Sequence, residues 1–211
     1  TAQTHDSIVG VKGAFEKLLR NVAFFAKQKK YTKIIAQIMI TEENLGELSE
    51  LSSLLKEEGA DLIRIGHPTF LSASDVDKNK KICEKHFPGE DISGMSYISD
   101  TGERSDRYFN AIKELKNKFN HNLAFLPNLG DSEIRDWYSK DFKTHRKCLF
   151  LWRATFIHPN GDVHPCESLK YPIGNIYKEE FDKIWNGKKY IKLRKLLKKG
   201  LLPACTRCCK L

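Results

Sequence analysis

The sequence predicts an α/β fold with a parallel sheet, followed by a small α+β domain that carries most of the cysteines. Helix and strand signals alternate over the first two thirds of the 211 residues, which is typical of a parallel sheet. This alternation ends at about residue 145, after which a hairpin signal and clustered cysteines follow. Apolar residues make up 40% of the chain and charged residues 30%, as in ordinary globular proteins.

The first part contains short β-branched apolar runs separated by helical periodicity. Residues 33–40 form a nearly continuous apolar run, which predicts a strand buried on both faces. Thr41 is a candidate N-cap for the next helix, and Gly59 a candidate helix stop. Because the sequence opens on a helix, we expect that an earlier strand is missing and that the chain is part of a longer protein. The expected elements are a helix at 10–28, a strand at 33–40, a helix ending at Gly59, a strand at 61–66, a helix at 73–87, a loop at 88–104, a helix at 106–119 and a strand at 123–126.

The last part predicts a β-hairpin and two helices. Asn160-Gly161 is a strong hairpin-turn signal between residues 150–157 and 162–164. Helices are expected at about 179–185 and 188–199, the second with an apolar side and many lysines. Gly200 and Pro203 follow in the order that usually ends a helix. The parallel sheet could be doubly wound or curled into part of a barrel.

Five of the six cysteines lie in the last 64 residues. Cys148 and Cys166 bracket the hairpin, and Cys205 and Cys208 form a Cys-x-x-Cys turn, so one site could gather all four. Four thiolates suit either a structural Zn²⁺ or a [4Fe–4S] cluster. Because no secretory signal is evident, we expect a cytoplasmic protein in which such cysteines bind metal more often than they form disulfides. Zinc ribbons usually use two short knuckles, which the wide Cys148–Cys166 spacing does not match.

The formal charge of +9 lies almost entirely in the last 42 residues. Residues 1–169 hold 24 basic and 24 acidic residues, whereas residues 170–211 hold 12 basic and 3 acidic residues. A basic tail can bind nucleic acid, but aromatic residues are sparse in it and no nucleic-acid motif is present. No apolar run approaches the roughly 20 residues that cross a bilayer. We therefore interpret the charge first as a solvated helix face beside the cysteines.

The spacing Cys148, twelve residues, Gly161, four residues, Cys166 resembles the opening motif of the SPASM/twitch domain of radical SAM enzymes. The Gly174-Asn175-Ile176 segment, the basic helix and the Cys205–Cys208 pair follow in that domain's order. The His5-Asp6 segment and the strand ends at Asn44 and Gly66 similarly resemble the radical SAM partial (β/α)₆ barrel. The resemblance implies that residues 1–145 are the second half of that barrel and residues 146–211 a twitch domain.

This resemblance implies cofactors and partners. One auxiliary [4Fe–4S] cluster would be ligated by Cys148, Cys166, Cys205 and Cys208, with Cys209 as a spare thiol. The family's Cys-x-x-x-Cys-x-x-Cys motif is absent, so SAM and a second [4Fe–4S] cluster would depend on a preceding segment. In the full protein, reductive SAM cleavage would give a 5′-deoxyadenosyl radical that abstracts hydrogen from a small-molecule or peptide substrate. An acidic electron donor such as flavodoxin or ferredoxin is expected.

Two residues are candidates for a SAM or substrate pocket. Gly66 and His67 follow a predicted strand at the edge where α/β folds bind ligands; a hydrogen-bonded loop histidine is the ordinary alternative. The alternative function is a non-catalytic iron–sulfur or zinc protein whose basic face binds nucleic acid or a protein partner. Salt-dependent nucleic-acid binding would identify it.

Overall fold

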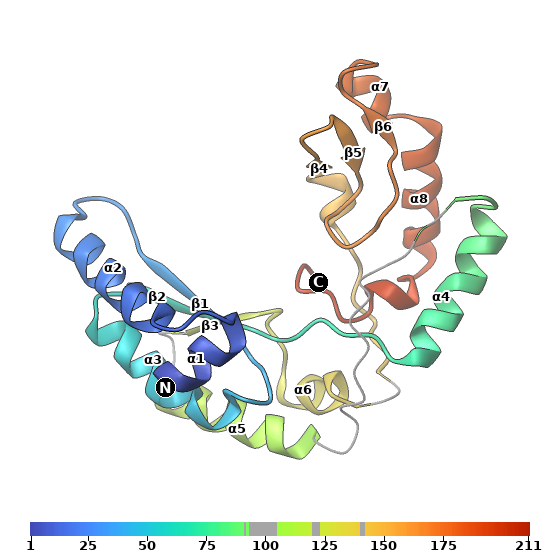
Figure 1. Cartoon of the computed structure of the whole chain (residues 1–211). Coiled ribbons are helices and arrows are strands. Elements are labelled where there is room, and N and C mark those ends of the chain that lie inside the picture. The colour runs from blue at the N-terminus through green and yellow to red at the C-terminus, as the bar shows by residue number, and fades with distance from the viewer. Residues whose placement is uncertain (91, 93–104, 120–122, 140–141) are drawn as a thin grey trace. The chain divides into compact units, whose positions relative to one another are not determined.

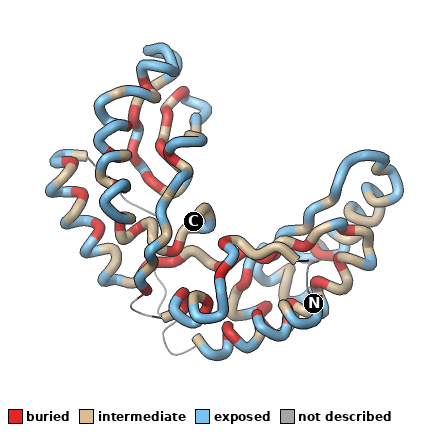
Figure 2. Tube along the Cα trace, turned by 180° about the vertical axis from the view of Figure 1, so that it is seen from behind, coloured by how far each residue is buried: buried red, intermediate tan, exposed pale blue. Residues whose placement is uncertain are grey.

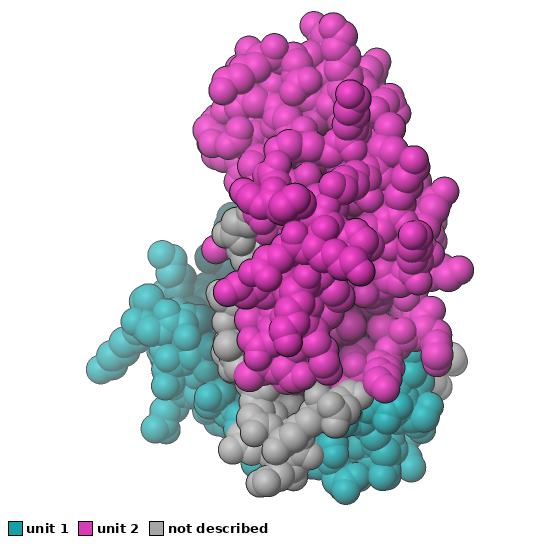
Figure 3. Space-filling model, turned by 90° about the vertical axis from the view of Figure 1, so that its right-hand side faces the viewer, with its two compact units in different colours: residues 1–68, 102–139 teal, residues 69–101, 140–211 magenta. Residues whose placement is uncertain are grey.

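The chain folds into two compact units that interleave along the sequence (Figure 1 and Figure 3). The computed structural model describes residues 1–90, 92, 105–119, 123–139 and 142–211. Unit 1 comprises Thr1–Pro68 and Gly102–Ser139, and unit 2 comprises Thr69–Thr101 and Lys140–Leu211. The expected division at residue 145 stays a prediction. Most of the expected loop at 88–104 lies outside the described residues.

Unit 1 is built on a parallel sheet, as the alternating pattern predicts. Its described strands are β1 (Ile35–Met39), β2 (Leu62–Gly66) and β3 (Leu123–Leu126), in the order β1-β2-β3. Both pairs are parallel, with Ile38 opposite Ile65 and Ile65 opposite Phe125. The parallel register brings the carboxyl ends of the strands to one edge of the sheet, where Gly66 and His67 lie.

The helices of unit 1 differ in detail from the expected ones. The elements are α1 (Ala2–Val9), α2 (Ala14–Gln28), the 3₁₀ turn η1 (Leu45–Glu47), α3 (Leu48–Glu57), α5 (Ser105–Phe119) and α6 (Asp131–Trp137). The helix expected from residue 10 begins at Ala14, because Gly10 and Gly13 adopt left-handed conformations. The Asp6 carboxylate accepts the N–H groups of Phe15 and Gly13, which lowers its pKa and fixes the turn between α1 and α2. Helix α6 has no counterpart among the expected elements.

The prediction that strand β1 is buried on both faces is wrong for the described structure. Ile38 is buried, but Ile35 and Met39 are 45% and 43% exposed. β1 lies at one edge of the described sheet, so one side of the strand has no neighbour among the described strands. An apolar run therefore predicts the strand but not its position in the sheet.

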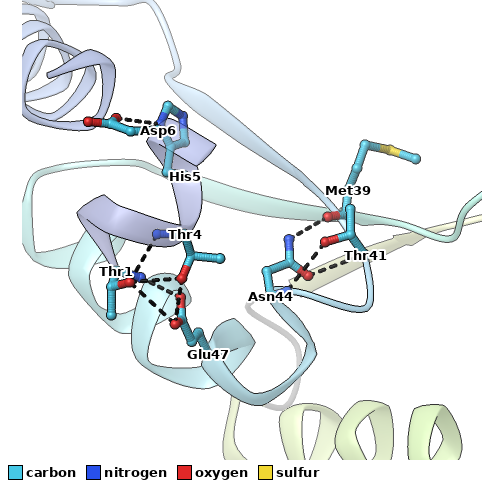
Figure 4. Close-up of polar contacts among 8 residues, drawn as sticks. All are labelled: Thr1, Thr4, His5, Asp6, Met39, Thr41, Asn44 and Glu47. Carbon is cyan, nitrogen blue, oxygen red and sulfur yellow. Dashed lines mark hydrogen bonds and ion pairs between the residues drawn. The ribbon is translucent and has the colours of Figure 1, made fainter. Parts of the chain in front are cut away.

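Asn44 ties the carboxyl end of β1 to the following turn (Figure 4). Its Nδ2 donates to the Met39 carbonyl at 2.8 Å, and its Oδ1 accepts the Thr41 N–H at 2.9 Å. Thr41 Oγ1 accepts the Asn44 N–H at 3.3 Å. Thr41 thus closes this turn and is not the N-cap of α3, which corrects the prediction. Gly59 is the expected helix stop, because its backbone is left-handed and an added Cβ would collide with that of Ala26.

Unit 2 contains a small antiparallel sheet. Strands β4 (Phe156–Ile157), β5 (Asp162–His164) and β6 (Gly174–Asn175) pair in that order. The predicted Asn160-Gly161 turn joins β4 to β5, and Gly161 has φ 84°. The first arm of the hairpin is shorter than expected, because residues Phe150–Trp152 form a 3₁₀ turn, η3. Strand β6 has no counterpart among the expected elements.

Four further elements complete unit 2. They are α4 (Ala73–His86), α7 (Phe181–Trp185), α8 (Lys188–Lys199) and the 3₁₀ turn η4 (Pro203–Cys205). Tyr190, Leu193 and Leu197 of α8 are buried in the core, as the apolar periodicity predicts. Figure 2 colours the chain by burial and shows buried residues (red) interspersed with exposed ones (pale blue) along the helices. Gly200 is the C-cap of α8, as expected, and its backbone is extended. None of the described helices is both long and apolar enough to span a membrane.

Helix α4 belongs to the core of unit 2 although it lies between two strands of unit 1 in the sequence. Cys83 and Phe87 are buried in the same apolar cluster as Leu151, Val163 and Tyr171. The Phe87 and Tyr171 rings meet edge to face, with centroids 5.3 Å apart. Cys83 is therefore a buried packing residue, as expected from its isolation in the sequence.

Candidate metal centre

Three separate segments of unit 2 bring four cysteines to one small cavity. Cys148 lies just before η3, Cys166 follows β5, and Cys205 and Cys208 lie at and just after η4. All four side chains line the same cavity. The short β4–β5 hairpin explains how Cys148 and Cys166, distant in sequence, reach the same place. None of the six cysteines is in a disulfide.

The rest of the cavity wall is mostly apolar. Its other lining residues are Phe150, Leu151, Ser168, Leu169, Ala204, Lys210 and Leu211. Such a wall excludes water and favours the neutral form of the thiols. Burial, followed by the nearby Cys166 and Cys148, raises the pKa of the Cys205 thiol, and burial also raises that of Cys166. Four thiolates would therefore repel one another here unless a cation lay among them.

Lys210 brings positive charge to this wall. Its Nζ lies 4.3 Å from the Phe150 ring centroid and 4.6 Å from that of Phe156. Nζ also lies 3.5 Å from a Glu167 carboxylate oxygen. The charge of Lys210 opposes the effect of burial on the pKa of Cys166. The sequence places Lys210 only two residues after Cys208, but it does not show that the side chain returns to the cavity.

Cys209 differs from the four lining cysteines. It is exposed and is not among the cavity-lining residues. A hydrogen bond with Cys208 raises the pKa of the Cys208 thiol and lowers that of Cys209. Its position outside the cavity favours the interpretation of Cys209 as a spare thiol, which stays a prediction.

The spacing of the cysteines bears on the choice of metal. Among the described residues, no three Cys, His, Asp or Glu side chains converge as closely as a single bound metal ion requires. A tetrahedral Zn²⁺ with bonds of about 2.3 Å would hold its sulfurs about 3.8 Å apart. The four cysteines line one cavity, and a [4Fe–4S] cluster takes one thiolate at each of its irons.

The basic helix α8 is less uniformly solvated than its sequence suggests. Lys189 pairs with Glu90 at 2.7 Å, and Lys192 Nζ lies 5.0 Å from the Phe87 ring centroid. Arg194 turns inward and donates to the carbonyls of Leu151 and Trp185 at 2.9 and 2.7 Å. Part of the positive charge therefore supports the packing of unit 2.

His67 of unit 1 is buried rather than exposed in a loop. Its Nδ1 lies 2.9 Å from the Tyr138 hydroxyl, and its backbone N–H donates to the Leu126 carbonyl at 2.8 Å. The aromatic rings of Phe125, Trp137 and Tyr138 surround the imidazole. Nε2 has no hydrogen-bond partner among the described residues. Gly66 precedes it at a position where an added Cβ would collide with Met39 Sδ.

Burial makes His67 a source of acid sensitivity. Desolvation, with a smaller effect of Lys116, lowers its folded pKa to about 3 from 6.5. Below pH 6.5, His67 therefore binds a proton in the unfolded chain but stays neutral in the folded chain. The contribution of His67 to the free energy of unfolding thus falls as the pH drops from 6.5 toward 3.

We expect the free-energy advantage of the wild type over His67→Gln to shrink by about 1.4 kcal/mol per pH unit below pH 6. Urea unfolding at pH 7, 6 and 5 measures it. Because both proteins share all other titrating groups, parallel stability curves would contradict a neutral, buried His67.

Comparison with known proteins agrees with this site. Residues 148–209 match the family model of the SPASM iron–sulfur cluster-binding domain, which spans all four lining cysteines. A pre-heme d1 synthase from Dinoroseobacter shibae is 26% identical over 200 residues, covering 87% of this chain and 46% of the relative. An AdoMet-dependent heme synthase from Methanosarcina barkeri is 26% identical over 203 residues, covering 92% of this chain and 53% of the relative.

A solved structure shares the fold. The crystal structure of Streptococcus suis SuiB superposes with a TM-score of 0.53 at 14% identity, covering 88% of this chain and 41% of that one. The chain spans about half the length of the curated relatives it matches. The resemblance deduced from the cysteine spacing is thus confirmed: residues 148–209 match the SPASM iron–sulfur domain, and over most of its length the chain is similar to a pre-heme d1 synthase and an AdoMet-dependent heme synthase.

Proposed function

We propose that the chain is the second half of a radical SAM enzyme, in which Cys148, Cys166, Cys205 and Cys208 hold one auxiliary [4Fe–4S] cluster. The convergence of these four thiols on one apolar cavity is the observation that carries the proposal. The donor set fits the group, since thiolates are the usual ligands of iron–sulfur clusters and the cluster cations would relieve their mutual repulsion. When bound, the cluster would supply one-electron chemistry or structural support.

The chain's own residues would set the properties of this site. With four cysteine ligands no iron would be left open to substrate, which favours electron transfer or structure over substrate binding. Phe150, Leu151 and Leu169 would exclude water, and Lys210 would offset the negative charge of the thiolates. The exposed lysines of α8 would suit docking of an acidic electron donor such as flavodoxin or ferredoxin.

Unit 1 would contribute the second half of a partial (β/α)₆ barrel. Its parallel β1-β2-β3 sheet with intervening helices supports this topology. Gly66 and His67 lie at the carboxyl edge of the sheet, where a SAM or substrate pocket would be lined, and His67 Nε2 has no hydrogen-bond partner among the described residues. SAM cleavage and a second [4Fe–4S] cluster would depend on a preceding segment. The relatives' names make tetrapyrroles the first substrate class to test.

Metal analysis of the anaerobically purified chain tests the cluster directly. We expect about four irons and four sulfides per chain, since each iron of the cluster takes one of four thiolates. Zinc should be far below one per chain. Stoichiometric zinc without sulfide would replace this proposal by the zinc-protein alternative.

A further inference from the structure

Helix α4 reaches the Cys205–Cys208 turn through two polar side chains. Asp75 and Asn79 are four residues apart on α4 and therefore lie on the same face. Both contact residues beside or between the two cysteines, although more than 120 residues of chain separate them. α4 thus supports a turn that the cysteine motif alone does not explain.

The first contact is a buried ion pair. Arg207 stands between Cys205 and Cys208, and its side chain is only 1% exposed. Its Nη1 lies 3.2 Å from Asp75 Oδ2, and its guanidinium lies 4.3 Å from the Phe70 ring centroid. A buried guanidinium needs a fixed anion, so Asp75 determines where the residue between the two cysteines can lie.

The second contact fixes the backbone. Asn79 is 5% exposed, and its Oδ1 accepts the N–H of Ala204 at 3.3 Å. Its Nδ2 donates to the Ile92 carbonyl at 3.2 Å, which orients the amide. Ala204 immediately precedes Cys205, and the Cys205 N–H donates to the Leu202 carbonyl at 2.8 Å. The start of the Cys-x-x-Cys turn is therefore held from two sides.

We propose that Asp75 and Asn79 are positioning residues for the auxiliary cluster, acting through Arg207 and the Ala204 amide on Cys205 and Cys208. This inference rests on the proposed cluster site. Helix α4, which lies between β2 and β3 in the sequence, would then help to hold the ligands of the cluster in place. The Asp75–Arg207 pair also places opposite charges beside the site, and these charges act on its reduction potential in opposite directions.

Redox titration of the cluster in the full chain, followed by electron paramagnetic resonance, tests the charge argument. Asp75→Asn removes an anion but keeps an acceptor for Arg207, so the midpoint potential should rise. Arg207→Gln removes the cation, so the potential should fall. Asp77→Asn is the matched control, because Asp77 is an exposed carboxylate on the same helix. Potentials equal to the control in both variants, or shifts of the same sign, would overturn the role of the pair.

Hydrogen exchange of the metal-free chain tests the backbone contact. Asn79→Leu should accelerate exchange of the Ala204 amide at least tenfold, whereas Asn79→Asp keeps the acceptor and should stay near the wild-type rate. Equal exchange in all three proteins would overturn the role of Asn79. If the wild type binds no iron, the proposed cluster is refuted, but the exchange experiment still tests whether Asn79 holds the turn. If iron binds through the cysteines but the variants change neither the midpoint potential nor the Ala204 exchange rate, only the inference about α4 is refuted.

Discussion

Replacement of Cys205 by serine is expected to reduce the bound iron from about four to below one per chain, because the cluster loses one of its four thiolate ligands. Cys205 is partly buried at the cavity, and a hydroxyl there is a much poorer ligand. The same loss is expected for serine at positions 148, 166 and 208. Iron and sulfide analysis, with the visible absorption of the reconstituted chain, measures the effect.

Cys209→Ser is the matched control for this series. Cys209 neighbours Cys208 in the chain but is exposed and outside the cavity lining. It should keep its full iron and sulfide content. If Cys209→Ser lost the cluster while Cys208→Ser retained it, Cys209 would be the fourth ligand, and the assignment drawn from spacing would be wrong.

Asp75→Ala is expected to lower the free energy of unfolding of the metal-free chain by about 3–5 kcal/mol, the usual cost of removing one partner of a buried ion pair. The Arg207 side chain is 1% exposed and the Asp75 side chain 15% exposed, so the pair is largely shielded from water. Asp75 also accepts the Ser72 N–H at 3.0 Å in the capping box of α4, which adds to the loss. Urea unfolding of the wild type and the variant measures the difference.

A double variant separates the charge from the cap. Asp75→Ala combined with Arg207→Met removes both charges and leaves an apolar side chain near Phe70 and Phe142. Much of the stability lost in the single variant should return, because no buried charge is left unpaired. Additive losses in the double variant would show that the two side chains do not stabilise each other.

The sequence predicts the regular elements well where one local signal dominates. The β-branched runs at β1 and β2 predict strands, and the leucine and tyrosine spacing of α8 predicts its buried side. These signals depend only on neighbouring residues. The cysteine spacing and Gly161 likewise predict the resemblance to the SPASM domain, whose family model matches residues 148–209.

Features that depend on distant partners could not be predicted in this way. Arg207 looks like one more member of a basic tail, yet Asp75 makes it a buried structural cation. The apolar run predicts that Ile35 is buried, but Ile35 is exposed because its strand lies at the edge of the described sheet. Asn79 carries no motif, and its contact with Ala204 exists only because α4 packs in unit 2.

The interleaving of the two units has a consequence for biosynthesis. Every segment of unit 1 has been synthesised once Ser139 is added, whereas α4 is synthesised long before its partners in unit 2. Phe87 therefore meets Tyr171 only late in synthesis, and Asp75 meets Arg207 only after 132 further residues have been added. An excised peptide of residues 146–211 would retain all four lining cysteines but lose α4. We expect such a peptide to be a poor substitute for the domain in reconstitution work.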